Sequence, residues 1–403
     1  MTGTIVVISI FLKAFLWPQV PAGRLVTLEE AVDFALAHNP EIRRAQMEVD
    51  AAGGRRLQQS GYALPELVFR DEGLGDAHGD REISFGVEQR LELSGKRSLR
   101  KEAACYDYEA AAAELERVKK LVAADVRSSY FRTLYAQKLL EATNGLLDIL
   151  RKYQEMAAVR FEAGQATSVD ILRGRLELLK VQGEIIEARR ALRESRSALF
   201  RLTGQDDSGP PPAFADRESP PLAKDLAALE REAESRPSLR AAALRIDQAG
   251  AAARLARKSS WPEFTVGLYY PSLRTSAWGF SVGATIPIWR DKIRGEVLEA
   301  DAQREAEAAS LASRRQKIRY SLHAAFDNVK ASEEQLALFE KSVLNEVDNL
   351  LETGIAQYQY GKIDSLNLFD LYRLYRSTRL EYLGALERHE IALVELDVAG
   401  ESD

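Results

Sequence analysis

His78 is the residue whose surroundings most suggest chemistry. It stands two positions from Asp76 and two from Asp80, and an imidazole flanked by two carboxylates offers the donor types that bind a divalent cation. The segment is predicted to be a loop between two strands, however, and such a loop does not hold ligands in a fixed geometry. We therefore interpret His78 as part of a solvated turn and predict no metal site.

The remaining candidates for chemistry are isolated. His38 and His323 have no partner at ligand spacing, and His389 falls on an apolar helix seam, where we predict a packed side chain. Cys105 is the single cysteine, which excludes an internal disulfide and a cysteine zinc site, and we interpret it as a small apolar helix residue. The sequence holds no nucleophile elbow, phosphate-binding glycine loop or His-Glu-x-x-His pair. It predicts neither an enzyme nor a cofactor.

Composition narrows the class of protein further. The 403 residues include 55 basic and 61 acidic side chains, a formal net charge of −6, which argues against a strongly basic surface built to hold nucleic acid or anionic lipid. The mean hydropathy of −0.27 excludes a bundle of several transmembrane helices. Alternating strands in a membrane are compatible with it, because only every second residue needs to be apolar.

The N-terminus has the pattern of a signal peptide over residues 1–22. An apolar stretch over residues 5–17 is too short to cross a bilayer but suits a signal-peptide core. Val20 and Ala22 supply small residues before a predicted cleavage at Gly23, and no cysteine follows that would carry a lipid anchor.

The rest of the chain repeats itself. Three pairs of residues are separated by the same interval: Pro40 and Pro237, Gly86 and Gly283, Gly164 and Gly361. We predict a first repeat over residues 23–203, a proline-rich loop over 204–221, and a second repeat over 222–403.

Each repeat is predicted to contain the same series of elements. A helix begins at Pro40 or Pro237, with proline at its first position, and ends near Ser60 or Ser259. The later elements are β-hairpins at about 65–92 and 262–288, proline-free helices over 95–163 and 292–360, and returning helices that end near Leu202 and Val398. A helix of some 70 residues reaches on the order of 100 Å, so no compact globular domain accommodates it.

The hairpins alternate apolar and small or polar residues, which predicts one apolar face. We predict that this face contacts lipid and that Ser281 lies on the opposite, lumenal face. The predicted lipid-facing residues of the second hairpin are Phe264, Val266, Leu268, Phe280, Val282 and Ile286.

The returning helices carry apolar residues at alternating steps of three and four, which is typical of coiled-coil seams. The first seam is Val169, Leu172, Leu176, Leu179, Gly183 and Ile186. The second is Leu368, Leu371, Tyr375, Thr378, Tyr382, Ala385, His389, Ala392 and Leu396. Further apolar residues such as Leu366 and Phe369 lie off the second seam and indicate more than one neighbouring helix. Four strands are too few to close a barrel, so we predict an oligomer.

These features resemble the TolC family of outer-membrane efflux channels. The similar segments are residues 28–32 before Asn39-Pro40, the turn over 160–164, and residues 358–362. The resemblance implies a mainly α protein with a small β part, assembled as a homotrimer. In such a trimer a β-barrel in the outer-membrane lipid continues into a periplasmic α-helical barrel. It implies a passive duct that works with a periplasmic adaptor protein and an inner-membrane efflux pump.

Residues 89–97 are similar to a segment of CzcC-type channels, which implies heavy-metal cations as cargo and a pump of the resistance-nodulation-division type. Two alternatives stay open. The same fold could export drugs or a secreted polypeptide, or the chain could be a soluble periplasmic coiled-coil scaffold without a pore.

The resemblance also implies site residues. Asp370 and Asn367 match two carboxylates at the pore constriction, so one of the two is an amide here. Asp170 matches a position that holds the closed state, although its usual basic partner position is Ile363. The residues implied at the helix tips and the adaptor contact are Arg160, Gly164, Ser168, Asp170, Tyr360, Gly361 and Ser365.

Overall fold

The structure is a computed structural model of the full chain. It describes residues 25–72, 82–92, 94–204, 213–216, 222–270 and 277–401. The predicted signal peptide and the turn around His78 lie outside the described residues. Two compact units form, and each takes segments from both predicted repeats. The turn unit comprises Met1–Asn39, Ala123–Pro221 and Ala331–Val394, and the sheet unit comprises Pro40–Val122, Leu222–Lys330 and Glu395–Asp403.

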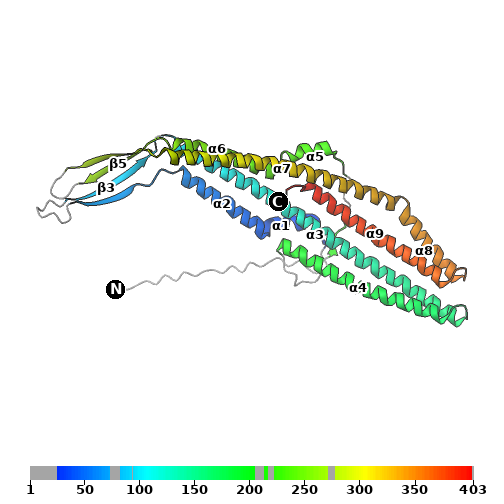
Figure 1. Ribbon diagram of the computed structural model, residues 1–403. Coiled ribbons are helices and arrows are strands. Elements are labelled where there is room, and N and C mark those ends of the chain that lie inside the picture. The colour runs from blue at the N-terminus through cyan, green and yellow to red at the C-terminus, as the bar shows by residue number, and fades with distance from the viewer. Residues whose placement is uncertain are drawn as a thin grey trace, which may run out of the picture. The chain divides into compact units, whose positions relative to one another are not determined.

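The sheet unit contains a four-stranded antiparallel sheet. Its strands, in spatial order, are β2 (Glu66–Glu72), β3 (Glu82–Leu91), β5 (Glu263–Tyr270) and β6 (Gly279–Thr285). β3 pairs with β5, so the two predicted hairpins form one sheet (Figure 1). β6 ends three residues before the predicted end of the hairpin at Ile288, because Pro287 cannot donate a hydrogen bond to a ladder.

Helices complete this unit. α2 (Pro40–Ser60) and α6 (Pro237–Lys258) begin with proline, as predicted, and bury mainly alanine. α5 (Leu226–Ala233) is a short helix that the sequence did not predict, and Asp225 caps its N-terminus. α3 (Lys96–Glu162) and α7 (Arg290–Leu338) start close after β3 and β6. α3 is continuous over 67 residues, which confirms the prediction of one very long helix.

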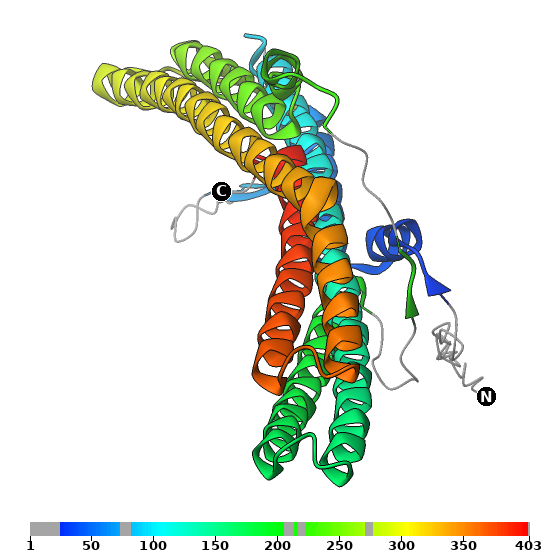
Figure 2. The same cartoon turned by 90° about the vertical axis from the view of Figure 1, so that its right-hand side faces the viewer.

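The turn unit is built from two antiparallel helix pairs. The end of α3 pairs with α4 (Ser168–Thr203), and α8 (Leu344–Gln359) pairs with α9 (Ser365–Asp397); both pairs reverse at the same end of the unit (Figure 2). Their shared core includes Leu150, Tyr153, Val181, Leu351 and Phe369. The sequence predicted an unbroken helix over 292–360, whereas a π-helical turn, Phe339–Val343, separates α7 from α8.

Smaller elements of the turn unit were not predicted. α1 (Leu28–His38) begins with a capping box formed by Thr27 and Glu30. β1 (Leu25–Val26) pairs in parallel with β4 (Ala213–Phe214) from the inter-repeat loop. The hydroxyl oxygen of Tyr130 lies 2.9 Å from the Val26 carbonyl oxygen and 2.8 Å from that of Ala215. This contact attaches the start of the first repeat and the inter-repeat loop to α3.

The C-terminal ends of the two returning helices, α4 and α9, accept hydrogen bonds of the same kind. The residue before each helix-starting proline is buried, and it donates to the last turn of the returning helix of the same repeat. The Asn39 amide donates to the Leu202 carbonyl oxygen at 2.8 Å, and the Arg236 guanidinium donates to those of Leu396 and Asp397 at 3.4 Å. Carbonyls at a helix C-terminus have no intrahelical partner, so each donor satisfies groups that the helix leaves open.

The predicted seam of α9 is confirmed, whereas that of α4 is not covered by its own chain and stays a prediction. On α9, Leu368, Thr378 and Ala385 are buried, and buried His389 has its Nδ1 2.9 Å from the Ser332 hydroxyl. The predicted α4 seam is exposed from Val169 to Ile186. α4 instead buries Gly174, Val181, Ile185 and Ala188. α4 carries two apolar stripes, and the spacing of residues alone does not tell which one faces its own chain.

Among the described residues, no helix combines the length and the apolar character that a membrane span requires.

Candidate functional site

The two helix turns have matching backbone geometry. Gly164 and Gly361 adopt φ values of 71° and 70°, in the left-handed region that favours glycine. The Gln165 N–H donates to the Arg160 carbonyl oxygen at 2.7 Å, and the Lys362 N–H donates to that of Gln357 at 2.8 Å. The Gly164 and Gly361 N–H groups donate to the Phe161 and Tyr358 carbonyl oxygens, both at 3.0 Å. Together these bonds form Schellman motifs, which satisfy the last carbonyls of α3 and α8.

Asp170 connects the start of α4 to the start of α9. It forms a capping box with Thr167, whose N–H lies 2.9 Å from its carboxylate, and it also accepts a hydrogen bond from the Ser365 hydroxyl. Burial alone would raise the pKa of the Asp170 carboxyl, but the hydrogen bonds from Ser365 and Thr167 outweigh it and hold this pKa below its ordinary value. Asp170 therefore links the two turns through a hydroxyl, where the family resemblance led us to look for a base.

Arg160 makes a second link between the turns. Its guanidinium donates to the Tyr358 carbonyl oxygen and to that of Gln165, and lies 4.6 Å from the centre of the Tyr358 ring. The Tyr358 ring is buried and packs 5.3 Å from the ring of Tyr153, which in turn contacts Phe369. Burial raises the pKa of the Tyr153 hydroxyl above its ordinary value, so this phenol is neutral at physiological pH.

The structure thus brings together part of the predicted tip set. Arg160, Asp170, Gly361 and Ser365 take part in the cross-links or lie beside them. Ser168 and Tyr360 are exposed, and Tyr360 is 79% accessible. The aromatic cluster beneath the turns was not predicted, because its members come from three helices that are distant in sequence.

The predicted constriction residues lie on α9 with exposed side chains. The Asp370 carboxylate is 3.4 Å from the Arg373 guanidinium, which also lies 3.3 Å from Glu177 on α4. The backbone N–H of Asn367 donates to the Asp364 carboxylate at 2.9 Å, so Asp364 caps α9. Asp370 therefore has a cationic partner one helical turn away, and sequence reasoning missed this counter-ion.

One face of the sheet is apolar and exposed. Cross-strand register places Val266 opposite Val282, and Leu268 opposite both Phe280 on β6 and Val87 on β3. Phe280 is 72% accessible, and Phe264 shares the same face. Ile286, the last of the predicted lipid-facing residues, follows the end of β6 and is exposed as well.

The opposite face carries a compact polar cluster. The Tyr269 ring lies over Gly86, where an added Cβ would come within 2.2 Å of the ring. The Arg70 guanidinium sits 4.5 Å from the ring centre and donates to the Tyr269 hydroxyl and to the Glu88 carboxylate, both at 2.9 Å. Ser281 lies on this face, opposite Gly267.

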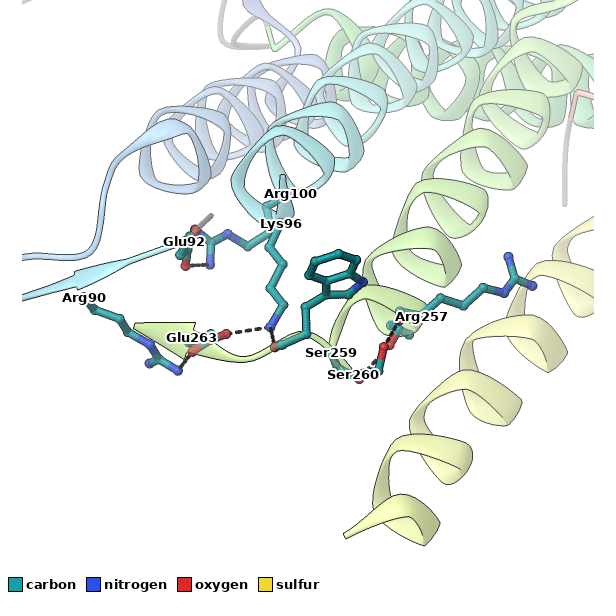
Figure 3. A network of polar contacts seen from close by, with 10 residues as sticks. Arg90, Glu92, Lys96, Arg100, Arg257, Ser259, Ser260 and Glu263 are labelled. Atoms are coloured by element: carbon teal, nitrogen blue, oxygen red, sulfur yellow. Dashed lines mark hydrogen bonds and ion pairs between the residues drawn. The ribbon is translucent and has the colours of Figure 1, made fainter. Parts of the chain in front are cut away.

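Charged residues join the sheet to the first long helix (Figure 3). The Glu263 carboxylate at the start of β5 accepts hydrogen bonds from Lys96 at 2.9 Å and from Arg90. The Lys96 ammonium also donates to the Trp261 carbonyl oxygen at 3.2 Å. The segment over residues 89–97 therefore connects β3, α3 and the second hairpin.

A second pair in the same network fixes the start of α3. The Arg100 guanidinium donates two hydrogen bonds to Glu92, at 2.7 and 2.6 Å, in a bidentate arrangement (Figure 3). Both partners are largely buried. The first turn of α3 contains basic residues and no acid, which opposes the helix dipole, and the two glutamates provide the missing negative charge.

Metal-binding side chains are not clustered in the described part of the chain. No group of three or more His, Cys, Asp or Glu side chains there could hold a metal ion. The Cys105 thiol is free and half-buried.

Two solved structures superpose on almost the whole of this chain. The structure of CusC superposes with a TM-score of 0.80 at 20% identity, covering 96% of this chain and 95% of that one. The open state of the Neisseria gonorrhoeae MtrE outer membrane channel superposes with a TM-score of 0.77 at 20% identity, covering 93% and 88% of the two chains. The chain therefore shares the fold of these two structures.

Sequence comparison identifies the family. The sequence model described as outer membrane efflux protein matches twice, over residues 31–205 and 228–399, so the chain belongs to the outer membrane efflux protein family. The cobalt-zinc-cadmium resistance protein CzcC of Cupriavidus metallidurans is 27% identical over 94% of this chain and 91% of its own length.

Proposed function

We propose that this chain is the subunit of a homotrimeric exit channel in the outer membrane, that it belongs to a tripartite efflux system, and that its cargo is heavy-metal cations. In this proposal an inner-membrane resistance-nodulation-division pump supplies the energy and a periplasmic adaptor protein contacts the helix turns. The protein itself is a passive duct, and a signal peptide directs it across the inner membrane.

The observation that carries the proposal is the sheet. An exposed apolar face opposite a polar face suits a wall between lipid and a water-filled lumen. In the described part of the chain, β2 and β6 each have one edge without a partner strand. Three copies joined at these edges would supply twelve strands, enough to close a barrel.

The turns supply a gate in this proposal. Within one subunit, the Asp170–Ser365 and Arg160–Tyr358 contacts hold the two helix pairs together at their ends. Opening by the adaptor would have to move or break these contacts. These contacts are a few hydrogen bonds, which the Asp170 carboxylate accepts and the Arg160 guanidinium donates. Breaking them costs little free energy compared with disrupting the packed core behind them.

The proposed cargo is heavy-metal cations. It is supported by the similarity to CzcC, a cobalt-zinc-cadmium resistance protein, over most of both chains. Asp370 would form a ring of three carboxylates around a threefold axis, which favours cations. Its ion pair with Arg373 weakens that preference at rest.

Two measurements test the proposal. The mass of the detergent-solubilised protein by light scattering should be that of a trimer, and a monodisperse monomer would contradict the channel. In a bacterium that lacks its own channel of this type, expression together with the cognate pump and adaptor should lower cellular cobalt, zinc and cadmium. If the trimer forms but only drug or polypeptide export is restored, the cargo assignment is wrong. Extraction from cells without detergent would favour a soluble scaffold.

A further inference from the structure

The segment that connects β6 to α7 exposes a cluster of large apolar side chains. Ile286, Ile288 and Trp289 are 69%, 66% and 75% accessible. They continue the series of exposed apolar residues on β6, where Phe280 and Val282 lie on the apolar face of the sheet. A tryptophan at the end of a lipid-facing strand is typical of the boundary between hydrocarbon and water.

Exposed basic residues follow immediately. Arg290, Lys292 and Arg294 lie in the first turns of α7, and no side-chain hydrogen bond or ion pair joins any of them to another described residue. Asp291 is the single acid in the first turn of α7. Cations at a helix N-terminus oppose the helix dipole and destabilise the helix. Three such cations without a described counter-ion therefore indicate an interaction partner for them.

At the corresponding place in the first repeat, the start of α3, basic side chains are paired with carboxylates of the same chain. There, Lys96 and Arg100 at the start of α3 are paired with Glu263 and Glu92 (Figure 3). At the start of α7 the basic side chains are equally numerous, yet the described residues provide them with no carboxylate. Among the described residues, the charge of these basic side chains is therefore left without a counter-ion.

We propose that residues 286–294 form an interface anchor that binds the phosphate groups of anionic phospholipids. Ile286, Ile288 and Trp289 enter the edge of the hydrocarbon region, while Arg290 and Arg294, one helical turn apart on the same side of α7, contact lipid phosphates. This inference rests on the proposed membrane channel and adds the class of lipid that borders it. A phospholipid surface fits better than a second copy of the chain, because the anchor is continuous with the apolar face that is proposed to contact lipid.

Fluorescence quenching by brominated lipids tests the anchor. Replacing Trp17, Trp261 and Trp278 by phenylalanine leaves Trp289 as the reporter in the full-length protein, which is reconstituted into mixed vesicles. One lipid of each mixture is brominated, either phosphatidylglycerol or phosphatidylcholine. We expect both lipids to quench Trp289, with a roughly 25-fold preference for phosphatidylglycerol, about fivefold from each of the two arginines. Removing one cation should lower this preference about fivefold, and Arg290→Gln/Arg294→Gln should bring it close to one.

A matched variant controls for net charge. Arg175 and Lys362 are also exposed and have no side-chain partner among the described residues, so Arg175→Gln/Lys362→Gln removes the same charge outside the anchor and should leave the lipid preference unchanged. Equal quenching by the two lipids in the parent protein would overturn the inference while leaving the channel intact. Loss of the trimer in Arg290→Gln/Arg294→Gln would overturn it too and would identify a second copy as the partner. If neither lipid quenched Trp289, the proposed membrane channel would fail as well.

Discussion

Glu263→Gln tests whether the contact between the second hairpin and the first long helix stabilises the protein. The Lys96 and Glu263 side chains are only 10% and 18% accessible, and the Nζ and Oε1 atoms are 2.9 Å apart. Glutamine keeps the size of the side chain but removes its charge, which leaves the ammonium with the Trp261 carbonyl oxygen alone as a strong acceptor. Hydrogen bonds to charged groups contribute about 1.5–3 kcal/mol. Because water screens this pair poorly, we expect a loss of about 2–3 kcal/mol in the free energy of unfolding.

The control is an ion pair with a similar N–O distance whose side chains are exposed to water. Arg254 and Glu102 also connect the second repeat to α3, at 2.6 Å, but their side chains are 49% and 38% accessible. Exposed pairs contribute little, so Glu102→Gln should cost less than about 1 kcal/mol. Urea-induced unfolding of the protein refolded into lipid vesicles, followed by circular dichroism at neutral pH, gives both values. Equal losses in the two variants would refute the reasoning from burial.

Three further predictions concern the lipid face, the pore and the turns. Val282→Arg should cost about 2–4 kcal/mol of membrane stability if Val282 lies near the bilayer midplane, and Ser281→Arg should cost clearly less; equal loss of insertion would show that the faces are reversed. Asp370→Ala should leave its basic partner unneutralised and shift the single-channel reversal potential towards anion preference, and an unchanged potential would place Asp370 among ordinary surface charges. Because the pKa of Asp170 is lowered in the fold, its hydrogen bonds stabilise the protein above the ordinary aspartate pKa of 3.8 and are lost as the pH falls through the folded pKa. Ser365→Ala should therefore lower the free energy of unfolding by about 1 kcal/mol at pH 7 and by almost nothing at a pH low enough to protonate Asp170. Urea unfolding at pH 7 and at that low pH measures the difference.

Local patterns predicted most of the long elements. Proline at the first helical position marked α2 and α6, and glycine marked the turns after α3 and α8, because each residue has a conformational reason to stand there. Period-two alternation found β3, β5 and β6, with ends that differ by a few residues, whereas the pattern over β2 was weaker. These signals succeed because they depend on backbone geometry within a few residues.

The contacts that position the candidate site depend on distant residues. Lys96 and Glu263 are 167 residues apart, and each is an ordinary charged residue in its own segment. The ion pair of Asp370 with Arg373 was within reach of a local reading, since acid and base at i,i+3 share a helix face. The exposed stripe on α4 was predicted as a seam without a named partner, because an apolar pattern indicates that a face is covered and not by which chain.

The pairing of β3 with β5 has a consequence for biosynthesis. Arg70 and Tyr269, which meet across this seam, are 199 residues apart, so the first hairpin leaves the ribosome long before its neighbour exists. Until then β3 offers an open hydrogen-bonding edge beside a row of apolar side chains, a combination that promotes aggregation. Such non-local pairing is also slow, because the intervening chain must close first. In a nascent chain the first hairpin therefore stays open to wrong pairing until the second hairpin has been made.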